Sequence, residues 1–177
     1  MSDEAKLVQD IRETVRKKYG FEPNLISHLV TSPQVAQTYL SGFGFLEQCS
    51  LTPLDLHVAA LHVSVTNGCE YCATAHGAMS VKLGASLADV ERIGNHQPAT
   101  NPRLAAIGEA VRLLMEKRGH LSEDDLAHLG GLGINRRQVH EVIAVIALKT
   151  ISNYINHIEK TELNPEFSKI LEQAKAA

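Results

Sequence analysis

The chain has 177 residues, of which 44% are hydrophobic, and its formal net charge at pH 7 is -3. This composition excludes a disordered chain and suits one folded domain, which we expect to span residues 1–177. The charge gives no basic excess for nucleic acid or an anionic membrane surface, and the apolar runs are too short to cross a bilayer, so we expect neither partner.

Helical patterns follow one another along the chain, and no segment has the strict alternation of a strand. Capping residues, prolines at first helical positions and glycines after last turns mark the helix ends. We therefore expect an all-α, single-domain helical bundle with about seven to nine helices. The expected helices span about residues 3–18, 33–49, 53–66, 69–83, 86–94, 102–118 and 136–159, with a short one after Ser122, a last one from Pro165, and an apolar turn over residues 25–30.

The first residues, Met1-Ser2-Asp3-Glu4, are acidic and begin a helical pattern, so we expect no signal or transit peptide. Three cysteines without an export signal favour the cytoplasm, which is reducing, as the location. In that compartment, closely spaced cysteines indicate redox chemistry or metal binding more often than a permanent disulfide.

One stretch, NGCEYCATAH at residues 67–76, combines two of the three cysteines with a histidine. An Asn-Gly pair interrupts the helical pattern and helix formers follow, so Cys69 and Cys72 should lie on the first turn of a new helix. There the two cysteines share a face, His76 follows Cys72 by four residues, and the free N–H groups and helix dipole favour a thiolate. The stretch therefore predicts a reactive dithiol with a proton carrier beside it.

Polar residues also occur on apolar helix faces. In the last long helix an apolar stripe continues into Asn153 and His157, which are either satisfied core residues or part of the wall of the dithiol pocket. His57 and His62 are five residues apart on one helix and should point in different directions, and Cys49 should be a small buried hydrophobic residue. The stripe consists of Val139, Val142, Ile143, Ile146 and Thr150.

The residues from Asn67 to His76, N-G-C-x-Y-C-x-x-x-H, resemble the motif of the alkylhydroperoxidase D-like family, in the carboxymuconolactone decarboxylase superfamily. The resemblance is to the peroxidase-related branch and covers about residues 21–165. It implies an all-α fold that assembles into homo-oligomers, trimers or hexamers. Outside the motif it rests on Phe21-x-Pro23-Asn24-Leu25, Leu51-Thr52-Pro53 and Asn153-Tyr154-x-Asn156-His157.

The resemblance also implies roles for individual residues. Cys72 would be the attacking thiolate, Cys69 the resolving partner and proton donor, and His76 a member of the proton relay. Better-known members complete the relay with a glutamate twelve residues before the first cysteine. This sequence has His57 at that position, so a histidine would carry the proton instead.

The leading hypothesis is a thiol-dependent peroxidase or a disulfide reductase. The Cys72 thiolate would attack a peroxide oxygen or a disulfide sulfur, Cys69 would close the disulfide, and an external dithiol would reopen it. The helix N-terminus, a protonated His76 and a water bridge to His57 are expected to lower the pKa of Cys72.

Three other hypotheses stay open. Cys69, Cys72, His76 and His57 are an acceptable ligand set for tetrahedral zinc, although three ligands on consecutive helical turns fit a tetrahedron awkwardly. A lactone decarboxylase is the second alternative, and the cysteine pair argues against it because those members generally lack it. A structural disulfide without catalysis is the third.

The leading hypothesis needs no bound cofactor or resident metal, only an external dithiol. The expected partners are a small-molecule peroxide and a reductant that the resemblance suggests is a lipoyl-bearing or thioredoxin-like protein.

Overall fold

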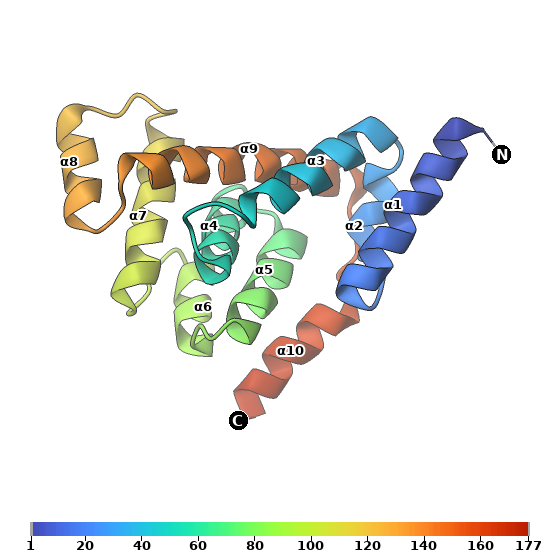
Figure 1. The fold of residues 1–177 in the computed structure, drawn as a ribbon. Coiled ribbons are helices and arrows are strands. Elements are labelled where there is room, and N and C mark those ends of the chain that lie inside the picture. The colour runs from blue at the N-terminus through green and yellow to red at the C-terminus, as the bar shows by residue number, and fades with distance from the viewer. Residues whose placement is uncertain (1, 177) are drawn as a thin grey trace.

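The computed structural model describes residues 2–176, and among these residues it contains ten α-helices and no strand (Figure 1). Met1 and Ala177, the two ends of the predicted domain, lie outside the described residues. None of the described helices is long and apolar enough to cross a membrane. The helices are α1 Asp3–Tyr19, α2 Asn24–Leu29, α3 Pro33–Leu46, α4 Pro53–Thr66, α5 Glu70–Lys82, α6 Leu87–Gly94, α7 Pro102–Glu116, α8 Glu123–Gly131, α9 Arg136–Glu159 and α10 Pro165–Ala176.

The predicted all-α fold is confirmed, with one more helix than expected. The segment predicted as an apolar turn is the six-residue helix α2. Leu25, Ile26 and Leu29 are all buried, so one side of this short helix faces the core. Tertiary packing therefore stabilises a helix that is too short for its sequence to indicate.

The helix starts follow from local capping chemistry. At α4, Thr52 and Asp55 form a reciprocal capping box, and Pro53 occupies the first turn. The same box occurs at α8 with Ser122 and Asp125. Helix α9 follows the N-cap residue Asn135, whose side chain accepts a hydrogen bond from the N–H of Gln138.

Helix α4 is the central element of the bundle, and it packs against α5, α7 and α9. Val58, Ala59, Ala60 and Val63 are completely buried, and they lie on several sides of the helix. A helix that is apolar all round must be enclosed by others. This enclosure fixes the position of the α4–α5 connection, which carries the two neighbouring cysteines.

A second apolar cluster lies around that connection. It is formed by residues of α1, α2, α3, α5 and α10, and Cys69 and Cys72 belong to it. Helix α10 packs against α5, so the last helix of the chain covers the segment with the cysteines. The other members include Ile11, Val15, Leu25, Leu29, Tyr39, Tyr71 and Phe167.

Asp55, two residues before His57, makes its contacts outside the cysteine region. Its carboxylate is 2% exposed and accepts two hydrogen bonds from Arg103, from Nε at 3.1 Å and from Nη2 at 3.0 Å. It thereby joins the start of α4 to α7.

Candidate functional site

The two neighbouring cysteines lie at the start of α5, as predicted. Cys69 is the N-cap residue and Cys72 is in the first turn. Asn67 ends α4, and Gly68 reverses the chain direction with φ 68°, a conformation that favours glycine. The Cys69 N–H then donates to the carbonyl of Ser64 at 2.8 Å, which fixes the entry into the new helix.

The sulfurs of Cys69 and Cys72 are free thiols that share one hydrogen-bond donor from α9. Asn156 Nδ2 lies 3.1 Å from Cys72 Sγ and 3.7 Å from Cys69 Sγ. Ser152 Oγ lies 3.8 Å from Cys72 Sγ. Cys69 is 3% exposed and Cys72 is 1% exposed, so this pair is held inside the protein rather than on its surface.

Lys149, also on α9, is completely buried beside this pair. Its Nζ has no hydrogen-bond partner among the described residues, and it lies 5.8 Å from the centre of the Tyr39 ring. Its influence on the sulfurs is therefore that of a nearby positive charge rather than of an aligned hydrogen bond.

The surroundings shift the pKa values of the two thiols in opposite directions, so that Cys69 donates a hydrogen bond and Cys72 accepts it. The pKa of Cys72 is lowered well below its usual value by the hydrogen bond from Cys69, against the effect of burial, with Lys149 adding its positive charge. The pKa of Cys69 is raised, first by that same hydrogen bond and then by burial. Cys72 is thus the group that ionises, and Cys69 keeps its proton.

His57 of α4 and His76 of α5 form a second pair. Their Nδ1 atoms are 3.0 Å apart, so one ring donates its N–H to the other. Burial and, after it, the positive charge of Lys149 lower the pKa of His57 to about 4. Burial, Lys149 and His57 in turn hold the pKa of His76 well below its usual value. Both rings are neutral at pH 7, so the positive charge near Cys72 comes from Lys149. The sequence had suggested a protonated His76 as the source of that charge.

A cavity of about 80 Å³ brings these groups together. Cys72, Lys149, His57 and His76 all line it, which places the thiol, the ammonium and the two imidazoles on one small space. The remaining wall is mainly apolar and aromatic, and it includes Tyr39 and Phe167. A cavity of this size admits only a small molecule.

Comparison with known proteins finds a family whose model is similar to part of this chain. Residues 33–111, which contain all four predicted site residues, match the carboxymuconolactone decarboxylase family. None of the curated proteins compared with the chain matches it.

Solved structures extend the comparison to nearly the whole chain. The alkylhydroperoxidase core of a peroxidase-related protein from Ralstonia eutropha JMP134 has a TM-score of 0.81 at 24% identity, covering 94% of this chain and 91% of that one. A peroxidase-related protein from Silicibacter sp. TM1040 has a TM-score of 0.77 at 20% identity, covering 94% and 90%. The debrominase Bmp8, solved as a cysteine-to-alanine variant with 2,3,4-tribromopyrrole, has a TM-score of 0.71 at 16% identity, covering 98% and 94%.

These matches confirm the predicted resemblance to the alkylhydroperoxidase D-like family and its fold. The zinc alternative gains no support, because no three His, Cys, Asp or Glu side chains within residues 2–176 are grouped so that they could hold a metal ion.

The buried face of α9 differs from the predicted stripe. Val139 and Val142 are buried, but Ile143 is 44% exposed and His157 lies at the surface, stacked on Tyr154. The buried face of α9 instead turns toward the cysteines. It continues through Val145, Lys149, Ser152, Asn153 and Asn156.

The buried face of α9 was predicted from apolar residues alone, and this prediction was wrong because the side of the helix nearest the sulfurs is polar. Sequence reasoning therefore missed Lys149, Ser152 and Asn156 as site residues. The spacing of 145, 149, 152 and 156 is a regular helical period, and it would have revealed the face if polar residues had been counted.

Asn153 has a structural role next to the site. Its Oδ1 accepts a hydrogen bond from Asn67 Nδ2 at 2.9 Å, and its Nδ2 donates to Ser64 Oγ at 3.4 Å. It thus holds the α4–α5 connection, in agreement with the interpretation as a satisfied core residue. Cys49 is partly buried and packs against the main apolar core.

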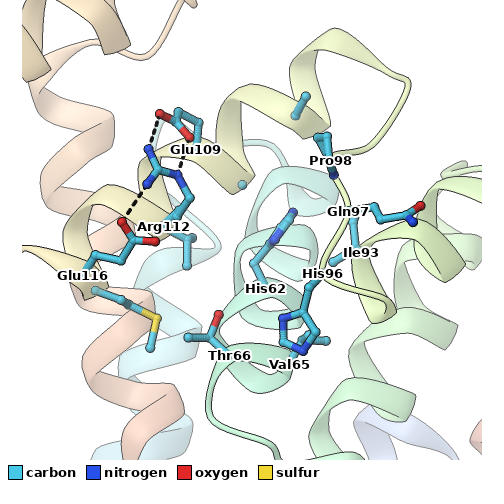
Figure 2. A pocket seen from close by; sticks show the side chains of 14 residues that line it. His62, Val65, Thr66, Ile93, His96, Gln97, Pro98, Glu109, Arg112 and Glu116 are labelled. Atoms are coloured by element: carbon cyan, nitrogen blue, oxygen red, sulfur yellow. Dashed lines mark hydrogen bonds and ion pairs between the residues drawn. The ribbon is translucent and has the colours of Figure 1, made fainter.

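A larger cavity of about 660 Å³ lies elsewhere in the molecule and contains none of the dithiol residues (Figure 2). It is lined by His62 and Thr66 of α4, by His96, and by Arg112 of α7, which pairs with Glu109 and Glu116. His57 and His62 therefore face different cavities, as their spacing predicted.

Proposed function

We propose that the protein is a thiol-dependent peroxidase or disulfide reductase in which Cys72 attacks and Cys69 resolves. One observation carries the proposal: two buried free thiols share the Asn156 donor, and Cys72 lines a small cavity. Dithiols with one ionised member and an accessible reaction space are suited to two-electron oxidation and disulfide exchange.

In the peroxidase reaction, the Cys72 thiolate attacks the nearer peroxide oxygen and the O–O bond breaks. Cys72 becomes a sulfenic acid, and the other oxygen leaves as an alcohol or water after it gains a proton. The Cys69 sulfur then attacks Cys72, expels hydroxide and forms the Cys69–Cys72 disulfide. An external dithiol reduces that disulfide and restores both thiols.

His57 and His76 are proposed to relay protons between the chamber and its surroundings. The contact between their Nδ1 atoms supports this role, because a neutral imidazole pair can pass a proton along an N–H···N hydrogen bond. His57 then replaces the glutamate that the better-known relatives are expected to use.

The proposal needs no bound cofactor. Its reductant would be a lipoyl-bearing or thioredoxin-like protein, and its substrate a small peroxide or a disulfide. The three free cysteines suit the reducing conditions of a cytoplasm. A homo-oligomer, a trimer or a hexamer, is part of the same proposal.

The test is an assay of peroxide consumption with several dithiols, on the wild type and the Cys72→Ser and His57→Glu variants. We expect activity in the wild type and loss in Cys72→Ser. Activity found only in His57→Glu would contradict the proposed relay, since it would mean that the natural residue blocks peroxide turnover. A brominated pyrrole should also be tested as a substrate, because the debrominase Bmp8 shares this fold.

A further inference from the structure

Lys149 is a buried cation that the family motif does not explain. Its side chain is completely buried, and Nζ has no hydrogen-bond partner among the described residues. Removing an ammonium from water is costly, and a buried lysine keeps its charge only when an anion lies close by. The surroundings of Lys149 should therefore contain its counter-ion.

The residues around Lys149 offer only one suitable anion. The cavity that Lys149 lines has no Asp or Glu in its wall. The two imidazoles are neutral and bound to each other, and a tyrosine ordinarily keeps its proton until about pH 10. A thiolate at Cys72 remains, and Asn156 and Ser152 support it from α9. The titratable groups that face Lys149 are Tyr19 from α1, Tyr39 from α3, His57 from α4, and Cys69, Cys72 and His76 at the start and in the body of α5.

We propose that Lys149 is a catalytic residue of the dithiol site, which holds Cys72 as a thiolate and donates a proton to the oxygen that leaves when an alkyl hydroperoxide is cleaved. This proposal rests on the proposed function. In this step the oxidant is a small, uncharged alkyl hydroperoxide, whose alkoxide is too basic to leave without a proton. The small chamber with apolar and aromatic walls suits such a molecule.

The step balances as follows. The Cys72 thiolate gives an electron pair to the terminal O–H oxygen of R–O–O–H, the S–O bond forms and the O–O bond breaks. Sulfur is oxidised by two electrons and the peroxide is reduced. The departing RO⁻ takes a proton from the Lys149 ammonium and becomes ROH, which leaves a neutral amine. The amine then takes the Cys69 proton, Cys69 attacks the sulfenic acid, and the expelled hydroxide becomes water with the proton that the lysine has received. One proton from solvent recharges Lys149.

The geometry favours Lys149 over the histidines for this task. Cys72 and Lys149 line the same cavity and attract each other, whereas His57 and His76 use their Nδ1 atoms on one another. A neutral imidazole of depressed pKa is also a poor reservoir for a proton that must be ready before the peroxide arrives.

The experiment compares Lys149→Met, which keeps the length of the side chain and removes its charge, with Lys82→Met, which removes an exposed charge at the end of α5. Sulfenic acid formation is followed in single turnovers with two oxidants, an alkyl hydroperoxide and peracetic acid. The carboxylate that leaves from a peracid needs no proton. We expect Lys149→Met to slow the reaction with the alkyl hydroperoxide by about 100-fold or more, and the reaction with peracetic acid by a clearly smaller factor. Lys82→Met should leave both rates unchanged.

The pH dependence of Cys72 alkylation by iodoacetamide is the second measurement. The midpoint should move upward by about one pH unit or more in Lys149→Met and stay in place in Lys82→Met. Equal losses with the two oxidants, or an unmoved midpoint, would show that Lys149 only fills space and would overturn the proposal.

If Lys149→Met does not fold, a measurement on the wild type tests the proposal instead. Thiolate absorbance near 240 nm should report one ionised thiol at pH 7, and it should disappear in Cys72→Ser. A protonated Cys72 in the wild type overturns the ion pair. If the wild type consumes no peroxide with any dithiol, the proposed function fails. If the wild type is active and Lys149→Met matches it, only the role of the lysine fails.

Discussion

Asn156 is the residue whose side chain touches both sulfurs, through Nδ2 at 3.1 Å from Cys72 and 3.7 Å from Cys69. A hydrogen bond to an ionised group contributes about 1.5–3 kcal/mol, so Asn156→Leu should raise the pKa of Cys72 by about one unit or more. The midpoint of Cys72 alkylation against pH should move upward by about the same amount. The matched control is Asn153→Leu, one turn earlier, which loses bonds to Asn67 and Ser64 and should destabilise the fold without moving the alkylation midpoint. A similar midpoint in both variants would contradict the role of Asn156.

The buried histidines make stability depend on pH. Burial lowers the pKa of both His57 and His62 from 6.5 to about 4. Between pH 6.5 and about pH 4, these histidines are therefore protonated in the unfolded chain but not in the folded protein. Their contribution to stability is complete above pH 6.5 and decreases as the pH falls toward about 4. We expect each histidine to cost about 1 kcal/mol or more between pH 7 and pH 5, measured by urea unfolding.

The control for this prediction is His62→Leu, which removes one of these groups at a distance from the dithiol cavity. The loss of stability between pH 7 and pH 5 should be smaller in this variant, and its peroxide consumption should be unchanged. An unchanged loss of stability would mean that His62 is protonated as easily in the folded protein as in the unfolded chain.

Single residues divide into those that spacing reveals and those that only packing reveals. The C-x-x-C-x-x-x-H pattern located Cys69, Cys72 and His76, and the family resemblance pointed to His57. Lys149 was not predicted, because a lysine in an amphipathic helix ordinarily faces water. Its burial depends on a thiol that lies far away in the sequence, and no local pattern carries that information.

Two glycines of α3 test the packing of this helix against α9 (Figure 1). A methyl group on Gly42 would lie 2.6 Å and 2.9 Å from the two Cδ atoms of Leu148, whereas one on Gly44 would meet nothing within 4 Å. Gly42→Ala should therefore destabilise the protein by about 1–2 kcal/mol through overpacking. Gly44→Ala should stabilise it by about 0.5–1 kcal/mol, because alanine favours the helix. Thermal unfolding of both variants measures the difference, and equal shifts in Tm would contradict the close approach of α3 and α9.

Helix boundaries were predictable where capping chemistry defines them, as at Thr52 and Ser122. The face that a helix buries was less predictable. In α9 the choice depends on partners from α4 and α5, and the inward side is polar because it faces the sulfurs and the connection before them. Helix α2 was not predicted as a helix for a related reason, since its burial rather than its length stabilises it.

The whole molecule leaves apolar side chains of α9 exposed. Ile143, Tyr154 and Ile158 are 44%, 57% and 75% exposed, and their spacing places them on one side of the helix. An exposed apolar face of this kind is typical of a protein interface, so we expect a homo-oligomer in sedimentation experiments. Ile158→Glu should lower the observed mass while the helix content stays constant, and Leu83→Glu, which changes an exposed leucine at the end of α5, should not. A wild type that sediments as a single chain would contradict the prediction.

Phe167 of α10 has a consequence for the synthesis of the protein. Its ring packs against Phe21 and Tyr71 and closes one wall of the dithiol chamber. A ribosome makes Cys69 and Cys72 long before it makes Lys149 and Phe167. The nascent chain therefore carries two unshielded thiols of ordinary acidity, which can exchange with any disulfide they meet. Selective reactivity arises only after α9 and α10 have been made and have folded over them.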